Sequence, residues 1–185
     1  MDSPELQDEL ERYHQASYGW ALSCCSRNSE QAESVLQTVY LKVLEGRARF
    51  DGKSSFKTWL FAVIRKTAAD ERRRNLLARL RLVKYEQSAG KHSHQEYQDE
   101  AIYRTQIQAL FRQALARLPR RQREVLELVF YHDLSLAEAA SVMGISIGSA
   151  RTHYDRGKKR LRQWIDESEV FNERAGRKQD QRAIP

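Results

Sequence analysis

The sequence lacks the long apolar run that a membrane-spanning helix requires. Its longest uncharged apolar stretch, at positions 59–64, is six residues, whereas a span needs about 18 or more. The first eleven residues are acidic and polar, without the basic start and apolar core of a secretory signal. We therefore expect a soluble, cytoplasmic protein with no membrane insertion.

Cysteine, glycine and proline are also scarce. The two cysteines, Cys24 and Cys25, are adjacent, and a disulfide between them would be badly strained, which excludes a disulfide scaffold. Eight glycines and three prolines are too few for a collagen-like or fully disordered chain. Neither the cysteines nor His14, His92 and His94 have metal-ligand spacing. We therefore predict no metal site, no cofactor and no enzymatic activity.

Basic residues are in excess, and helical periodicity dominates. The 32 Lys and Arg against 25 Asp and Glu give a formal net charge of +7. The 185 residues suffice for one ordinary domain or two small ones. Apolar residues recur at spacings of three and four through most of the chain, whereas strand and turn signals are few. This pattern predicts an all-α protein.

The N-terminal block is predicted to contain three helices, at residues 6–26, 32–44 and about 56–74. A loop at residues 49–55 separates the last two, because it contains a glycine and serines suited to N-capping. The inward stripe of the third helix consists of Phe56, Trp59, Leu60, Val63, Ile64 and Thr67. This assignment leaves Phe61 and Arg65 on other faces.

The helical periodicity of the sequence weakens after residue 74. Residues 75–104 have an irregular pattern and include a polar segment at residues 87–95, which we interpret as a flexible interdomain linker. A second helical block starts near Thr105 and stops before Pro119, which is well placed to begin the next helix. The last residues lose periodicity and are predicted to fray. The expected organisation is two small helical domains, at residues 1–74 and 105–168, with a linker at 75–104 and a tail at 169–185.

Residues 134–164 have the pattern of a helix-turn-helix. Ser135 and Glu138 have capping-box spacing, so a short helix starts there and ends at Gly144. Ser146 is placed to cap the helix that follows. Two helices joined by a tight glycine turn are typical of this DNA-binding motif.

The second of these helices separates into two faces at about 100° per residue. The packing face contains Ile147, Ala150, Tyr154, Gly157, Leu161 and Trp164, and Thr152, Asp155, Arg156, Lys159 and Gln163 lie roughly opposite. Residues 148–162 contain six basic side chains and one acid, which suits phosphate neutralisation, while the first two turns would reach base edges in a major groove. The alternative is a solvated face of an ordinary helical pair. The DNA-contacting candidates are Ser149, Arg151, Thr152, Asp155, Arg156 and Lys159.

Two motif sets in the chain resemble those of sigma-70 family transcription initiation factors. The segment ALARLPRRQREVLEL at residues 114–128, with the helix-turn-helix and RLRQWI at residues 160–165, resembles region 4. The segment FDGKSSFKTWL at residues 50–60, with the basic run at residues 72–74, resembles region 2 of the extracytoplasmic-function (ECF) group. Two such blocks and a connector are the architecture of that group. The resemblance implies an alternative sigma factor that directs promoter-specific initiation.

The resemblance also implies a role for each block. The first would bind the clamp of core RNA polymerase and the promoter −10 element, and the second the −35 element and the polymerase flap. The loop at residues 50–54 would receive a base flipped from the −10 strand, which costs a few kcal/mol. Stacking on Phe50, Trp59 or Phe61 would return about 1–3 kcal/mol per base, although Trp59 also fits simple core packing. The implied −10 contacts are Phe50, Asp51, Lys53, Ser54, Trp59, Phe61, Arg65 and Lys66.

One departure from the group lies at the start of the second helix. The group usually has Asp-Ala-Glu-Asp there and another acid four residues later, and these acids contact a basic helix of the polymerase clamp. This chain has QAES at residues 31–34 and Thr38 at the later acidic position. Losing about three negative charges weakens electrostatic docking.

A phosphoryl group adds about −1.5 to −2 charges, so we predict activation by a Ser/Thr kinase at Thr38 first and Ser34 second. Neutral drift with sufficient remaining contacts is the alternative. The polymerase-binding candidates are Glu33, Ser34, Gln37, Thr38 and Lys42.

Another mode of regulation and other functions fit parts of the sequence. Control by an anti-sigma factor that clasps both domains is common in the group. A stand-alone helix-turn-helix regulator would share the second block but would have a receiver or sensor domain in place of the first. An RNA-binding or structural helical protein would lack two DNA-binding blocks at this spacing.

Overall fold

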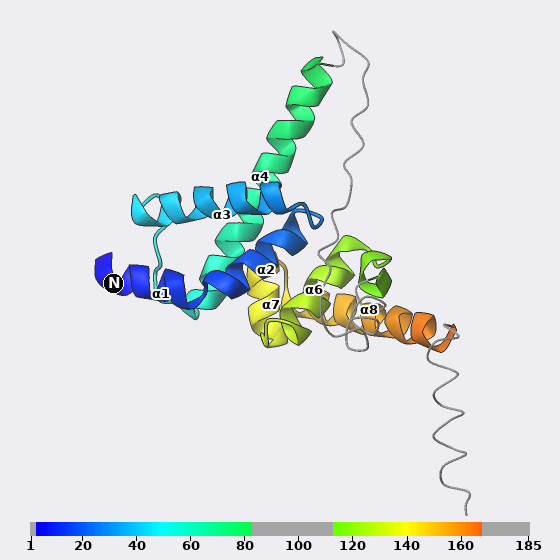
Figure 1. Cartoon of the computed structure of the whole chain (residues 1–185). Coiled ribbons are helices and arrows are strands. Elements are labelled where there is room, and N and C mark those ends of the chain that lie inside the picture. Colours follow the sequence, from blue (N-terminus) through cyan, green and yellow to red (C-terminus); the bar gives the residue numbers. More distant parts are fainter. Residues whose placement is uncertain (1–2, 83–112, 168–185) are drawn as a thin grey trace, which may run out of the picture. The chain divides into compact units, whose positions relative to one another are not determined.

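The computed structural model describes residues 3–82 and 113–167, and all regular structure within these ranges is helical (Figure 1). The predicted all-α class is therefore confirmed. None of the described helices combines the length and apolar character needed to cross a bilayer. The polar segment at residues 87–95, the helix start near Thr105 and the tail at residues 169–185 lie outside the described ranges. The helices are α1 (Ser3–Arg12), α2 (His14–Cys24), α3 (Ser29–Leu44), α4 (Phe56–Leu82), α6 (Arg120–Phe130), α7 (Leu136–Met143) and α8 (Ile147–Glu167).

These helices group into two compact units. The first contains α1 to α4 together with residues 137–145, and the second contains α6 and α8. In the first unit, α2, α3 and α4 pack against one another. In the second, α6 packs along α8.

The core of the first unit forms around Trp20. This side chain is fully buried, and its indole Nε1 donates a hydrogen bond of 3.0 Å to the carbonyl oxygen of Phe61. The two rings stack with centroids 5.9 Å apart. One bond thus satisfies the only polar atom of the indole while its rings exclude water. Apolar side chains of three helices complete this core, namely Ala21, Ala32, Val35, Val39, Leu60 and Ile64.

The expected outward position of Phe61 is wrong. Its side chain is 0% exposed, because α4 is covered by both α2 and α3. A helix packed on two neighbours buries a wider arc than a single stripe. Thr67, assigned to the inward stripe, is buried as predicted.

The predicted helix at residues 6–26 is instead two helices that meet at Tyr13. The backbone of Tyr13 has φ −97° and ψ 6°, outside the helical range. Its ring stacks on Phe56 of α4, with centroids 6.2 Å apart. Residues 12–14 contain neither glycine nor proline, so no helix-breaking residue marks this boundary in the sequence.

Two other boundaries differ from the sequence prediction. Helix α3 starts at Ser29 rather than at residue 32, because the Asn28 side chain accepts a hydrogen bond of 2.8 Å from the Gln31 amide and caps it. Helix α4 continues to Leu82 rather than stopping near residue 74. The added segment at residues 75–82 is rich in leucine, arginine and alanine, all strong helix formers.

Three local stop and start signals are confirmed. The Thr58 amide donates to Ser55 Oγ at 3.2 Å, so Ser55 caps α4. The Ser149 amide donates to Ser146 Oγ, also at 3.2 Å, so Ser146 caps α8. Gly144 has a φ of +62°, the left-handed conformation that ends α7.

Helices α6 and α8 lie close together at Gly157. A Cβ atom at this position would lie 2.9 Å from Leu126 Cδ1 and 3.3 Å from Gln122 Cβ. All three residues are buried. The glycine therefore sets the spacing between the two helices.

We predict that Gly157→Val lowers the free energy of unfolding by about 1–3 kcal/mol, because the new side chain overpacks the α6–α8 contact. Gly148→Ala is the matched control on the same helix, since its added Cβ would meet only Ser146 Oγ at 4.0 Å. Chemical denaturation of the full chain measures both. A Gly157→Val protein as stable as the wild type would contradict the close approach.

Candidate functional site

The exposed face of α8 agrees with its predicted reading face. Ala150 and Gly157 are buried, whereas the side chains assigned to DNA contact are exposed. The Thr152 hydroxyl donates to the Gly148 carbonyl oxygen at 3.0 Å. The exposed set is Ser149, Arg151, Thr152, Asp155, Arg156 and Lys159.

The packing face of α8 is narrower than predicted. Ile147 is 52% exposed, because it lies ten residues, or about 15 Å along the helix, from the contact at Gly157. Tyr154 is half-buried and stacks on the exposed Phe130 of α6, with centroids 5.9 Å apart. The Lys158 ammonium lies 5.1 Å from the Tyr154 ring centre. The expected position of Ile147 is therefore wrong.

The loop before α4 has a fixed turn with exposed charges. Gly52 adopts a φ of +72°. On either side of it, Lys53 Nζ pairs with Asp51 Oδ2 at 2.7 Å and the Lys53 amide donates to Asp51 Oδ1 at 3.3 Å. These bonds lower the pKa of Asp51 and raise the pKa of Lys53. Both groups are therefore ionised at neutral pH and present on the surface.

Four rings form an aromatic cluster beside this loop: Tyr13, Phe50, Phe56 and Trp59. Phe56 is 8% exposed and lies at the centre, 5.5 Å from Phe50, 5.2 Å from Trp59 and 6.2 Å from Tyr13 between ring centroids. Phe50 and Trp59 are 5.5 Å apart. The three outer rings are half-buried. Phe50 and Trp59 thus combine packing with partial access, whereas buried Phe61 has no accessible ring for a base.

The remaining −10 candidates differ in exposure. Ser54 and Arg65 are half-buried, and Lys66 is exposed. Sequence reasoning missed Tyr13, because its contact with Phe56 spans 43 positions and the predicted unbroken helix gave no reason to place it there. The sequence signal that could have suggested this contact was the aromatic residue itself.

The polymerase-binding candidates divide into two groups on α3. Glu33, Ser34 and Gln37 are exposed. Thr38 and Lys42 are half-buried and contact α4. The Thr38 hydroxyl donates to Glu71 Oε1 at 3.5 Å, and Lys42 Nζ donates to Thr67 Oγ1 at 3.1 Å.

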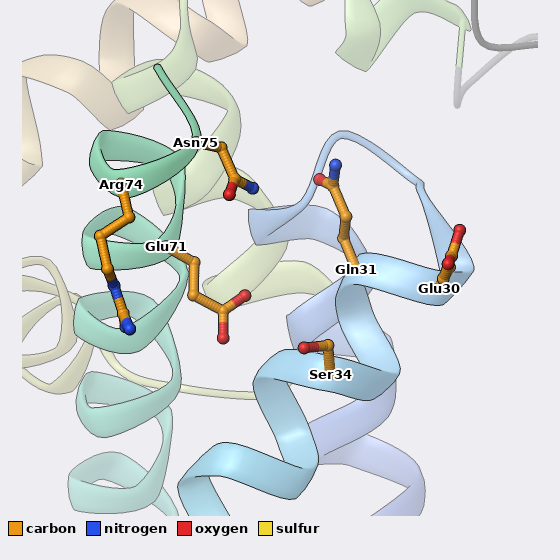
Figure 2. A pocket seen from close by; sticks show the side chains of 6 residues that line it. All are labelled: Glu30, Gln31, Ser34, Glu71, Arg74 and Asn75. Atoms are coloured by element: carbon orange, nitrogen blue, oxygen red, sulfur yellow. The ribbon is translucent and has the colours of Figure 1, made fainter. Parts of the chain in front are cut away.

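A shallow groove of about 430 Å³ lies between α3 and α4. Figure 2 shows Ser34 of α3 and Glu71 of α4 pointing toward one another across it. Glu71 was not predicted as a site residue, because its position opposite Ser34 depends on how the two helices pair. The groove is lined by Glu30, Gln31, Ser34, Glu71, Arg74 and Asn75.

The two cysteines have different environments at the end of α2. Cys24 is buried, and Cys25 is half-buried. Burial raises the pKa of the Cys25 thiol to about 11; nearby Glu71 adds to this rise and Arg72 opposes it. The Cys25 thiol is therefore protonated at neutral pH. Within residues 3–82 and 113–167, no group of three or more His, Cys, Asp or Glu side chains is placed to hold a metal ion.

The chain matches known proteins over both blocks. Residues 10–76 match the family described as Sigma-70 region 2, and residues 108–161 match that described as Sigma-70, region 4. The chain is 30% identical over 161 residues to the ECF RNA polymerase sigma factor SigX of Bacillus subtilis, covering 83% of this chain and 80% of SigX. It is 25% identical over 165 residues to the RNA polymerase sigma factor YlaC of the same species, covering 88% and 95%.

A solved structure has a similar fold. It is that of the sigma factor RpoE from Bartonella quintana in complex with the anti-sigma factor NepR, with a TM-score of 0.67, 22% identity and coverage of 89% of this chain and 98% of that one. Both sigma regions are thus matched in the expected order, and a relative at 30% identity is covered over most of its length. The chain belongs to the ECF group of the sigma-70 family, and it is an alternative sigma factor that acts in promoter-specific transcription initiation.

Proposed function

We propose that this sigma factor reads the −35 element with the exposed face of α8 and the −10 element with the loop and helix at residues 50–66. The observation that carries the −35 assignment is the cationic face of α8, which is exposed along two turns while the opposite face packs on α6. Side chains in its first turns reach base edges, and later cations hold phosphates. The match to region 2 favours this reading over a stand-alone helix-turn-helix regulator.

The test is run-off transcription. Core RNA polymerase supplemented with the full chain should start transcripts at defined promoter positions, whereas core polymerase alone should not. A helix-turn-helix regulator would change transcription only when another sigma factor is present. Failure of the chain, including its phosphorylated form, to bind core polymerase or confer specific starts would contradict the proposal.

Two positions on α8 are expected to behave differently. Arg156→Ala should cost about 1–3 kcal/mol of DNA binding and relax preference at particular bases. Lys159→Ala should weaken binding to all sequences and lower the salt slope by about one. Titration of the full chain, bound to core polymerase, against −35 duplex variants over a salt series measures both effects. Equal losses on every sequence for both variants would contradict this division.

The proposed polymerase-docking surface is the exposed part of α3. Glu33, Ser34 and Gln37 stand there, and an acidic clamp-binding patch would normally be completed by carboxylates that this chain lacks. The polar contacts of Thr38 and Lys42 with α4 favour a supporting position for these two side chains. The compartment that fits this role is the cytoplasm, where core polymerase is found.

Phosphorylation of α3 is the proposed route of activation, and its geometry favours Ser34 over Thr38. Thr38 is half-buried, and its hydroxyl already contacts the Glu71 carboxylate at 3.5 Å. A phosphoryl dianion placed there would meet a like charge at short range. Ser34 is exposed, and the groove beside it contains the cation Arg74 as well as the carboxylates Glu30 and Glu71. Its accessibility, rather than the local charge, therefore favours Ser34. This preference reverses the order expected from the sequence.

An acidic substitution should reproduce part of this effect. We expect Ser34→Glu to raise affinity for core polymerase by up to about fivefold, in line with one exposed ion pair. Thr38→Glu should gain less, because position 38 is half-buried and directly contacts the Glu71 carboxylate. Ser34→Ala and Thr38→Ala are the matched controls, and binding to labelled core polymerase is the measurement. Equal affinity of the wild type and both acidic variants would discard activation by phosphorylation.

An anti-sigma factor is the second candidate for control. The structurally similar RpoE was solved in complex with the anti-sigma factor NepR. We propose a partner of that class as the alternative to the kinase. Co-purification of such a protein with the unphosphorylated chain, and its release on induction, would support this alternative.

A further inference from the structure

The aromatic cluster contains a ring that the loop at residues 50–54 does not supply. Tyr13 enters it from the junction of α1 and α2 and stacks on Phe56 with an interplanar angle of 27°. Phe50 contacts the same central ring edge-on at 5.5 Å. Phe56 is nearly buried, whereas Tyr13, Phe50 and Trp59 are half-buried. The cluster thus extends an accessible aromatic surface from the loop to the first helix junction.

The junction that presents Tyr13 is held in place on both sides. The Tyr13 amide donates to the Glu9 carbonyl oxygen at 3.2 Å, and its own carbonyl oxygen accepts from the Ser17 amide at 2.8 Å. The next residue, His14, lies 3.1 Å from the Tyr40 hydroxyl through Nδ1. The backbone at Tyr13 is therefore held by hydrogen bonds on both sides, and the neighbouring residue His14 contacts α3.

The surroundings suit a single nucleic-acid strand. Exposed cations lie next to the cluster in the chain: Arg12 before Tyr13, Arg49 before Phe50 and Lys53 in the loop. Proteins that bind unpaired strands combine cations along the backbone with aromatic rings on which bases stack. A tyrosine presents a flat apolar face together with a polar tip that tolerates water.

We propose that Tyr13 stacks on an unpaired base of the −10 strand, next to the base received by the loop at residues 50–54. Strand opening then exposes two neighbouring bases to one continuous aromatic surface, with Phe56 as its shared support. This inference rests on the proposed −10 function of that loop. It adds a contact from the N-terminal helices to those expected from residues 50–66.

The experiment uses the full chain bound to core polymerase and a forked promoter DNA with 2-aminopurine at one −10 position at a time. Stacking quenches this fluorophore. Tyr13→Leu should restore fluorescence at one position beside the loop-bound base and weaken fork binding by roughly tenfold, the loss of one stacked base. Tyr13→Phe should resemble the wild type. Tyr18→Leu, which alters another half-buried tyrosine outside the aromatic cluster, is the matched control.

A second measurement leaves the protein unmodified. With 5-iodouracil at the position identified by quenching, irradiation of the wild-type complex should crosslink the base to Tyr13, and mass spectrometry of the digest locates the bond. This result does not depend on the folding of any variant.

The outcomes separate the inference from the function on which it rests. The stacking role would be overturned if Tyr13→Leu changed the 2-aminopurine fluorescence equally at all positions. It would also be overturned if no crosslink to Tyr13 formed while the base at the loop position was quenched. In that case Tyr13 only supports Phe56. If the wild-type complex quenches no −10 base and opens no promoter, the proposed function itself fails and the inference with it.

Discussion

The contact between Trp20 and Phe61 fixes how the long helix of the first unit is turned. The indole donates to the Phe61 carbonyl oxygen and its ring covers the Phe61 side chain. A donor buried without a partner costs about 1–3 kcal/mol, so this pairing strongly restricts rotation of α4. With Phe61 facing α2, Trp59 is carried about 200° around the helix to the rim of the core. The aromatic cluster beside the loop is a consequence of this orientation.

The same orientation aligns α3 and α4 along a polar seam. Thr38 meets Glu71, and one helical turn further Lys42 meets Thr67, so the two helices run antiparallel. The buried valines of α3, Val35, Val39 and Val43, lie next to this seam, about 80° around the helix. Side chains that a sequence presents as one polar face are thus split between the seam and the solvent. The solvent-facing part is the more accessible to a protein partner.

Local chemistry explains which features were predictable. Ser55, Ser146 and Gly144 act within three or four residues of their own positions, and each was recognised from the sequence. The exposed face of α8 was also predicted, because one packing stripe is enough to orient a helix with one main neighbour. Phe61 was misplaced because α4 has two neighbours, and the break at Tyr13 was missed because no glycine or proline marks it in the sequence. Glu71 was overlooked because helix pairing is not encoded in either helix alone.

The close contact at Gly157 has a consequence for the orientation of α8. At this position the α8 backbone lies against the side chains of Leu126 and Gln122, so there is no room for a Cβ atom. The direction in which the exposed side chains of α8 point is therefore set by its packing against α6. For the proposed −35 contact, these side chains would thus be oriented before DNA binds.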